Sequence, residues 1–213
     1  MPGGPYRREK ALIMSPFAVV ATTDDGSRRS DRRVLDEATR PTGPARDPQR
    51  TYTRRELMSG RHLVDIHDHL RADLARIHRL AERVADGSTE AGAARAEINA
   101  MALRRTDPAL TTYCANYCRM VTMHHGIEDA SMFPHLRRAD PRLAPVITRL
   151  EQEHHAIHGV LEEVDRALVG YVGDPSTVDR LRAAVDLLSD TLLSHLAYEE
   201  HELVEPIARL GMH

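Results

Sequence analysis

Apolar residues recur every three to four positions through most of the chain after residue 54, and this period predicts amphipathic helices. A first helix is expected from about residue 54 to just before Gly87. Three further helices are predicted to begin at Asp-Pro pairs, because Asp caps a helix N-terminus and Pro favours the first helical position. They are expected over about residues 108–132, 141–170 and 175–206.

Proline also predicts where these helices are interrupted. Phe133-Pro134 marks the end of the second helix or a kink in it, and Pro206 closes the last one. A short connecting helix is expected over residues 89–105. Four long amphipathic helices joined by short turns predict an all-α domain at residues 56–213, an up-down-up-down four-helix bundle.

Residues 1–55 lack this pattern. Six of the 12 prolines fall within the first 48 residues, among Gly, Arg and Asp clusters, and such a composition cannot bury a core. We therefore predict a largely disordered N-terminal extension whose removal leaves the bundle unchanged. An apolar stretch ending at Ala21 follows a basic segment, as in a weak secretory signal, but Pro16 interrupts it, and a cytoplasmic location is favoured.

Charge divides the chain at the same place. The chain has 29 Lys+Arg and 32 Asp+Glu, a net charge of −3; residues 1–56 carry 12 basic and 8 acidic groups (+4), which leaves 17 and 24 (−7) for the rest. An acidic body argues against a nucleic-acid partner, and no apolar run approaches the ~20 residues that span a membrane. Cys114 and Cys118 share a helix face; buried thiols are the favoured interpretation, and a redox role or a contact between chains stays open.

The 13 histidines all follow residue 61, and four helical segments carry them at one-turn spacing: VDIHDHL, MHHGIED, EHHAIH and SHLAYEE. Residues four apart share one helix face, so four such helices direct five imidazoles and two carboxylates to one spot. The residues are His67, His124, Glu128, His154, His158, His195 and Glu199.

A buried set of this kind is costly unless something compensates it. A single histidine on an apolar face is usually a satisfied core residue, but five with two glutamates on all four inward faces would destabilise the bundle without a metal. Four ligands close a structural zinc site, so seven ligands favour two octahedral iron or manganese ions.

The segments HHGIEDASMFPHL and SHLAYEEHELVEPI each have a carboxylate four residues after a histidine, then an apolar pair and Pro, and EHHAIH has His-x3-His. In this order the motifs resemble the hemerythrin family, in its HHE cation-binding branch, over about residues 60–210. The resemblance implies a four-helix bundle that holds two non-haem iron ions, bridged by carboxylates and an oxo group.

Carried onto this chain, the resemblance implies two bridging glutamates, Glu128 and Glu199. It implies terminal ligands at His67, His124, His154, His158 and His195. Family members place the fourth-helix carboxylate four or five residues after the histidine, so Glu200 is the alternative bridge; on a regular helix Glu199 lies about 40° from His195 and Glu200 about 140°. His125 and His155 lie about 100° around their helices from the chosen ligands and are interpreted as supporting or surface groups.

Five histidines on two six-coordinate irons leave one iron with an open position, which predicts binding or sensing of O2, NO or peroxide. A peroxide-decomposing or iron-donating di-iron enzyme is the alternative, and a metal-stabilised interaction module is the third. Peroxide chemistry needs proton donors near the open site. Tyr117 and Tyr198 are candidates for that role or for iron ligation, and packed tyrosines with satisfied hydroxyls are the simpler interpretation. The oligomeric state is not predicted.

Overall fold

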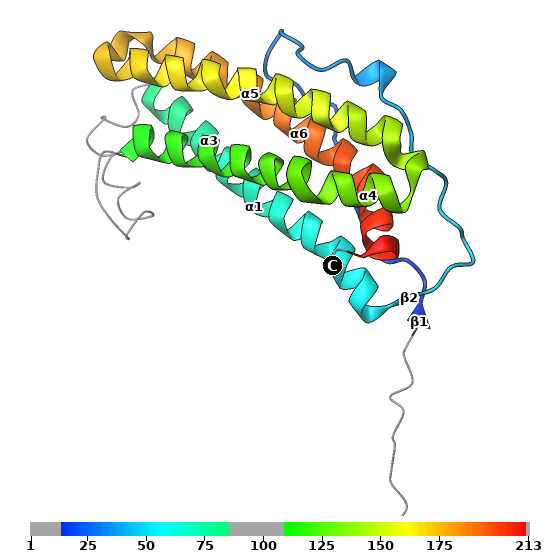
Figure 1. The fold of residues 1–213 in the computed structure, drawn as a ribbon. Coiled ribbons are helices and arrows are strands. Elements are labelled where there is room, and N and C mark those ends of the chain that lie inside the picture. The colour runs from blue at the N-terminus through cyan, green and yellow to red at the C-terminus, as the bar shows by residue number, and fades with distance from the viewer. Residues whose placement is uncertain (1–13, 86–108, 212–213) are drawn as a thin grey trace, which may run out of the picture.

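Four long helices form an up-down-up-down bundle in the computed structural model, which describes residues 14–85 and 109–211 (Figure 1). They are α1 (Arg54–Ala85), α3 (Ala109–Ile127), α5 (Ala144–Gly173) and α6 (Val178–Leu210). The predicted all-α bundle is confirmed. The connecting helix expected at 89–105 lies outside the described residues. No helix in the described part is both long and apolar enough to cross a membrane.

The helical structure does not end at Phe133-Pro134. After α3 it widens into a π-helical turn, η2 (Glu128–Met132), and continues as α4 (Phe133–Ala139). The backbone N–H of Phe133 bonds to the carbonyl of Glu128, five residues back. Pro134 has no N–H to continue a regular ladder, which favours such a widened turn at this point. The turn keeps Met132, Phe133 and Leu136 in the core.

The start signals before α5 and α6 operate as expected. Asp140 caps the short 3₁₀ turn η3 (Pro141–Leu143) by accepting the N–H of Arg142, and α5 follows. Asp174 accepts the N–H of Ser176 at η4 (Pro175–Thr177), and α6 follows. The predicted end at Pro206 is wrong, because α6 runs through it to Leu210. Buried neighbours on the same helix, among them Leu203 and Ile207, hold that last turn against the core although Pro206 provides no hydrogen-bond donor.

The core of the described part consists of two apolar clusters, and α1, α5, α6 and the run from α3 through η2 to α4 each pass from one to the other. The first cluster includes Leu70, Val121, Ile157 and Leu192. The second includes Leu63, Met132, Leu150 and Leu203. On each helix the residues between these positions include the histidines and glutamates predicted to bind metal, so a polar layer separates two apolar ones. The helices are close-packed at Gly60 of α1, where a Cβ would lie 2.6 Å from the carbonyl oxygen of Val204 in α6.

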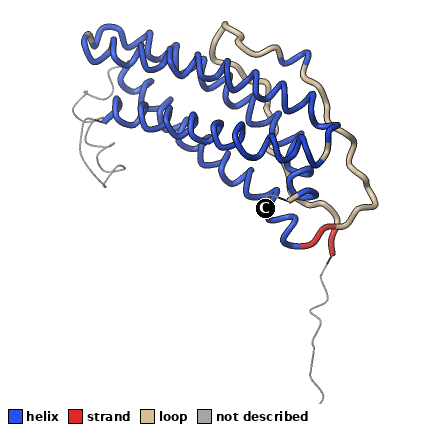
Figure 2. The backbone as a smooth tube through the Cα atoms, in the orientation of Figure 1, coloured by secondary structure: helices blue, strands red, loops and turns tan. Residues whose placement is uncertain are grey.

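Residues 14–53, which we call the strap, run along the bundle and return (Figure 2). The strap contains only a 3₁₀ turn, η1 (Glu37–Thr39), and two short strands at its ends. β1 (Met14–Ser15) pairs antiparallel with β2 (Tyr52–Thr53), so the ends of the strap lie side by side. This course differs from the disorder that the composition predicted; residues 1–13 lie outside the described part.

Backbone N–H groups of the strap donate hydrogen bonds to buried carboxylates of α6, and these bonds hold the polar strap against the bundle. Asp190 of α6 is buried and accepts the N–H groups of Arg29 and Ser30, at 2.9 and 2.8 Å. Glu202, also buried, accepts the N–H of Gly43 at 2.6 Å. A buried carboxylate without partners costs several kcal/mol, so the strap satisfies groups that the bundle alone leaves unpaired.

Candidate metal centre

Histidine and glutamate side chains from all four long helices meet in the polar layer between the two apolar clusters. They form two groups, and the ligand atoms of each group lie within 4.8 Å of one another. The first group is His67, His124, Glu128 and Glu199, and the second is His125, His154 and His195. Six of the seven predicted ligands are thus brought together.

Glu128 and Glu199 lie between the groups. One carboxylate oxygen of Glu128 is 3.1 Å from Nε2 of His124, and the other is 3.6 Å from Nε2 of His154. Glu199 Oε2 is 3.5 Å from Nε2 of His67 and 3.6 Å from Nε2 of His195. Each glutamate therefore faces a histidine on both sides, which is the placement that a carboxylate bridging two metal ions requires.

The inward-facing atoms lack partners. Of the ten buried side-chain N and O atoms without a hydrogen bond in the described part of the chain, seven belong to this cluster. They are Nε2 of His125, His154 and His195 and both carboxylate oxygens of Glu128 and of Glu199. Nε2 of His67 and of His124 face each other at 3.1 Å. Unpaired buried polar atoms are rare in folded proteins, and convergent nitrogen and oxygen donors fit a metal ion.

Burial sets the protonation of these groups. It lowers the pKa of His124 to about 3 and that of His154 to about 2, with a smaller contribution from neighbouring histidines. Burial also raises the pKa of Glu199 to about 8, and it raises that of Glu128, with the Glu199 carboxylate adding to the effect. The imidazoles are therefore neutral, as metal ligands must be, and the glutamates hold protons that a cation would displace.

A ring of outer carboxylates orients three of the histidines through Nδ1. His67 Nδ1 lies 2.9 Å from Glu200, His154 Nδ1 lies 2.8 Å from Asp129, and His195 Nδ1 lies 3.0 Å from Glu153. A carboxylate on Nδ1 fixes the tautomer that leaves the Nε2 lone pair free and directs it inward. Glu200 is thus fully buried like Glu199 but contacts the far side of His67.

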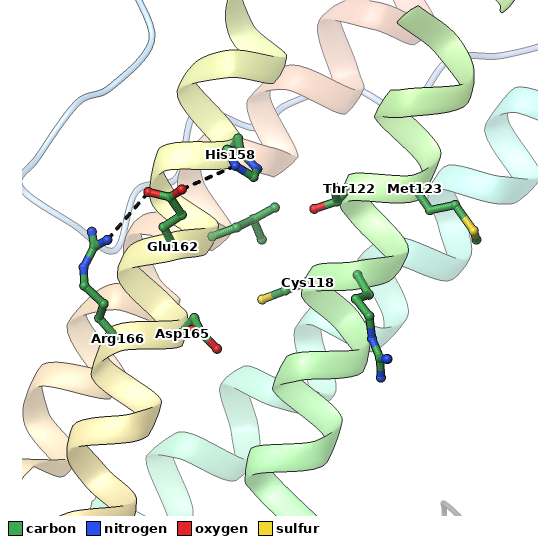
Figure 3. A pocket seen from close by; sticks show the side chains of 9 residues that line it. Cys118, Thr122, Met123, His158, Glu162, Asp165 and Arg166 are labelled. Atoms are coloured by element: carbon green, nitrogen blue, oxygen red, sulfur yellow. Dashed lines mark ion pairs between the residues drawn. The ribbon is translucent and has the colours of Figure 1, made fainter. Parts of the chain in front are cut away.

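His158 lies apart from the cluster. Its side chain is 59% exposed and pairs with Glu162 one turn later on α5 (Figure 3). It lines a groove of about 690 Å³ between α3 and α5, with Cys118 and Thr122 on the opposite wall. Cys118 is half-buried, and Cys114 lies outside the described side chains.

His125 is the residue that sequence reasoning left out of the ligand set. It is 5% exposed and stacks on His154, with ring centroids 4.0 Å apart and planes 9° apart. His125 is three residues before Glu128, and residues three apart are neighbours on a helix surface. That spacing could have identified His125 as a candidate ligand. His124 and His125 precede Glu128 by four and three residues, and each belongs to a different group.

The two tyrosines do not point at the ligand atoms with free hydroxyls. Tyr117 donates to the carbonyl of Leu70 at 3.1 Å, and Tyr198 donates to the carbonyl of Pro41 at 2.7 Å. A pocket of about 220 Å³ between α3 and α5 connects the cluster with the surface. Exposed Thr122 and His155 line its mouth, and His125 and His154 line its inner end.

The match to a known family covers this whole arrangement. The model of the hemerythrin HHE cation-binding domain matches residues 59–207, from the second turn of α1 to the last turn of α6. No curated protein and no solved structure shows significant similarity to the chain. The match extends over well over half of the chain and includes every residue of both ligand groups. The chain belongs to the hemerythrin family, as a member with the HHE cation-binding domain and a buried His/Glu cluster that is suited to a metal.

Proposed function

We propose that the cluster holds two non-haem iron ions and that the protein binds or senses a small oxidising or diatomic ligand, O2, NO or peroxide. The observation that carries the proposal is the position of Glu128 and Glu199, each facing histidines of both groups. A single tetrahedral ion uses four ligands, whereas this cluster offers seven side chains in two sets.

Each ion would be held by one histidine group and by both glutamates. His125, His154 and His195 would hold one ion, and His67 and His124 the other, with Glu128 and Glu199 shared. The pair of ions would supply an electron-rich site for reversible ligand binding. The second position would have one histidine fewer, which would leave a coordination site for an external ligand. His124 also has the most exposed side chain of the cluster, at 11%.

The chain's own residues prepare this centre. The outer carboxylates direct Nε2 of His67, His154 and His195 inward, and the two apolar clusters enclose the layer from either end. Imidazoles suit iron among other transition metals, and carboxylates suit hard ions, so the mixed donor set is compatible with iron.

Peroxide decomposition is the second candidate function, and the pocket between α3 and α5 favours it. Asp129 and His155 line that pocket next to His125 and His154, and both side chains can carry protons. Peroxide cleavage needs such groups close to the reacting atoms, whereas simple O2 binding does not.

The test is metal content and absorbance after aerobic purification with iron supplied. We expect about two irons per chain and near-ultraviolet absorption that is lost on reduction. A colourless protein with stoichiometric zinc would refute the di-iron assignment. Adding H2O2 to the iron-loaded protein then separates the two functions: sustained gas evolution indicates the enzyme, and a spectral change without gas indicates binding.

A further inference from the structure

The strap reaches the metal centre through the outer carboxylates. Arg40 of the strap donates two parallel hydrogen bonds to Glu153 of α5, from Nε to Oε1 at 2.8 Å and from Nη2 to Oε2 at 3.0 Å. Glu153 Oε2 in turn lies 3.0 Å from Nδ1 of His195. The guanidinium therefore contacts Glu153, and Glu153 contacts the ring of His195, whose Nε2 faces the metal position.

A second path uses the strap backbone. The N–H of Thr22 donates to Glu200 Oε2 at 2.7 Å, while Glu200 Oε1 lies 2.9 Å from Nδ1 of His67. Arg71 of α1 also contacts Oε1, at 2.7 Å. His67 and His195 belong to different ligand groups, so the strap reaches one histidine on each side of the bridging glutamates.

Further contacts hold Arg40 in this place. Its Nη1 donates to Ser194 Oγ at 3.0 Å, and its guanidinium lies 4.7 Å from the ring centroid of Tyr198. The Tyr198 hydroxyl returns to the strap at the carbonyl of Pro41. A planar guanidinium with both edges bonded and one face stacked has little freedom, so Glu153 is held by a rigid partner.

We propose that the strap is a working part of the metal centre: Arg40 and the Thr22 N–H are positioning groups that fix His195 and His67 through Glu153 and Glu200. The proposal rests on the proposed function, because it concerns how firmly the cluster retains iron. Partners of metal-bound histidines typically change metal affinity by about 10–100-fold. The strap acts one contact further out, so we expect an effect near the lower limit, about tenfold.

The experiment measures the rate at which iron-loaded protein loses iron to a strong chelator, together with its near-ultraviolet spectrum. Arg40→Met keeps an aliphatic side chain against Tyr198 but removes the guanidinium, and should speed iron loss about tenfold and shift the spectrum. Arg32→Ala is the matched control, since this strap arginine pairs with Glu163 on the exposed face of α5 and contacts no outer carboxylate. It should release iron at the wild-type rate.

A double-variant cycle tests whether Arg40 acts through Glu153. If it does, Arg40→Met adds little to iron loss in a Glu153→Ala background, because both changes break the same path. Thr22→Pro removes the N–H that Glu200 accepts and should also speed iron loss, whereas Thr23→Pro should not.

Three results would overturn the proposal: wild-type release rates in both Arg40→Met and Thr22→Pro, equal acceleration by Arg32→Ala, or fully additive effects of Arg40→Met and Glu153→Ala. Wild-type protein that takes up no iron would instead refute the proposed function, so the two failures are distinguishable.

Discussion

Glu199 and Glu200 are adjacent and equally buried, yet the structure predicts opposite effects for removing their charges. Glu199 lies between the two histidine groups, and Glu200 lies behind His67. The variants Glu199→Gln and Glu200→Gln change one atom each and keep the side-chain volume. Iron content and thermal stability, measured with and without iron, therefore distinguish a bridging ligand from a supporting one.

For Glu199→Gln we expect loss of at least one iron and a metal-free protein that is already more stable than the wild type at pH 7, because the unfolded wild-type carboxyl is ionised there and must take up a proton to fold. Burial raises the pKa of Glu199 from 4.5 to about 8, so the metal-free wild type already holds a neutral carboxyl group there. The stability that this neutral form gives is complete below the unfolded pKa and is lost as the pH rises through about 8. The stability advantage of the metal-free variant should therefore be small near pH 4.5, grow with pH, and level off above about pH 8.

The lost metal stabilisation is large enough to measure. A ligand at 100 times its Kd stabilises a fold by about 2.7 kcal/mol, and 1 kcal/mol shifts the Tm of a chain of this size by about 2–4 °C. Iron should therefore raise the wild-type Tm by about 5–10 °C, and Glu199→Gln should lose most of that increase.

For Glu200→Gln we expect the reverse pattern. The carboxylate bonds to His67, Arg71 and the Thr22 N–H, and these partners outweigh its burial and lower its pKa. A charged hydrogen bond contributes about 1.5–3 kcal/mol, so the metal-free Tm should fall by about 3–12 °C while iron is largely retained. Full iron in Glu199→Gln together with iron loss in Glu200→Gln would refute the assignment of the bridge.

Three further predictions test the rest of the site. His125→Ala should lower iron content and His158→Ala should not, by metal analysis; the opposite result would restore the ligand set that the family resemblance implied. Adding iron at pH 7 in weak buffer should release protons, because Glu128 and Glu199 hold protons without metal, and a pH indicator should report fewer protons from Glu199→Gln; equal release would place the displaced protons elsewhere. Deleting residues 1–51 should lower the Tm and speed iron loss, because the carboxylates of α6 lose their strap partners; unchanged values would show that the strap's contacts contribute nothing in solution.

The bundle was predictable because its signals repeat. Buried positions recur about every 3.6 residues along a helix, so Leu63, Leu70 and Leu74 identify the inward face of α1. His67 lies on the same face. The Asp-Pro pairs add local chemistry that marks where α5 and α6 begin. Periodicity therefore predicted the fold and also the level along the bundle at which six of the seven candidate ligands lie.

The strap was not predictable by the same reasoning. Its backbone N–H groups make the decisive contacts with Asp190, Glu200 and Glu202, and every residue except proline has an N–H. Such contacts leave no pattern of side-chain types. The signal lay on the other partner, in acidic residues that fall on a buried face of α6, and recognising them requires knowing which faces of the helix are covered.

His125 and His158 show the limit of spacing arguments inside the bundle. Spacing identifies which residues share a face of one helix, but it does not say how each helix is rotated relative to its neighbours. The rotation of α3 brings His125 against His154, and that of α5 turns His158 toward the groove with Cys118. Interhelical packing determines both rotations.

The pairing of β1 with β2 gives the strap a kinetic property. Since Met14 lies against Thr53, both ends are anchored at one point, and the segment between them is a closed loop. If the contacts of Arg40 or Thr22 open, the released segment stays tethered at a high effective concentration next to its docking carboxylates and rebinds quickly. The histidines behind those carboxylates thus experience brief interruptions rather than lasting loss of their support.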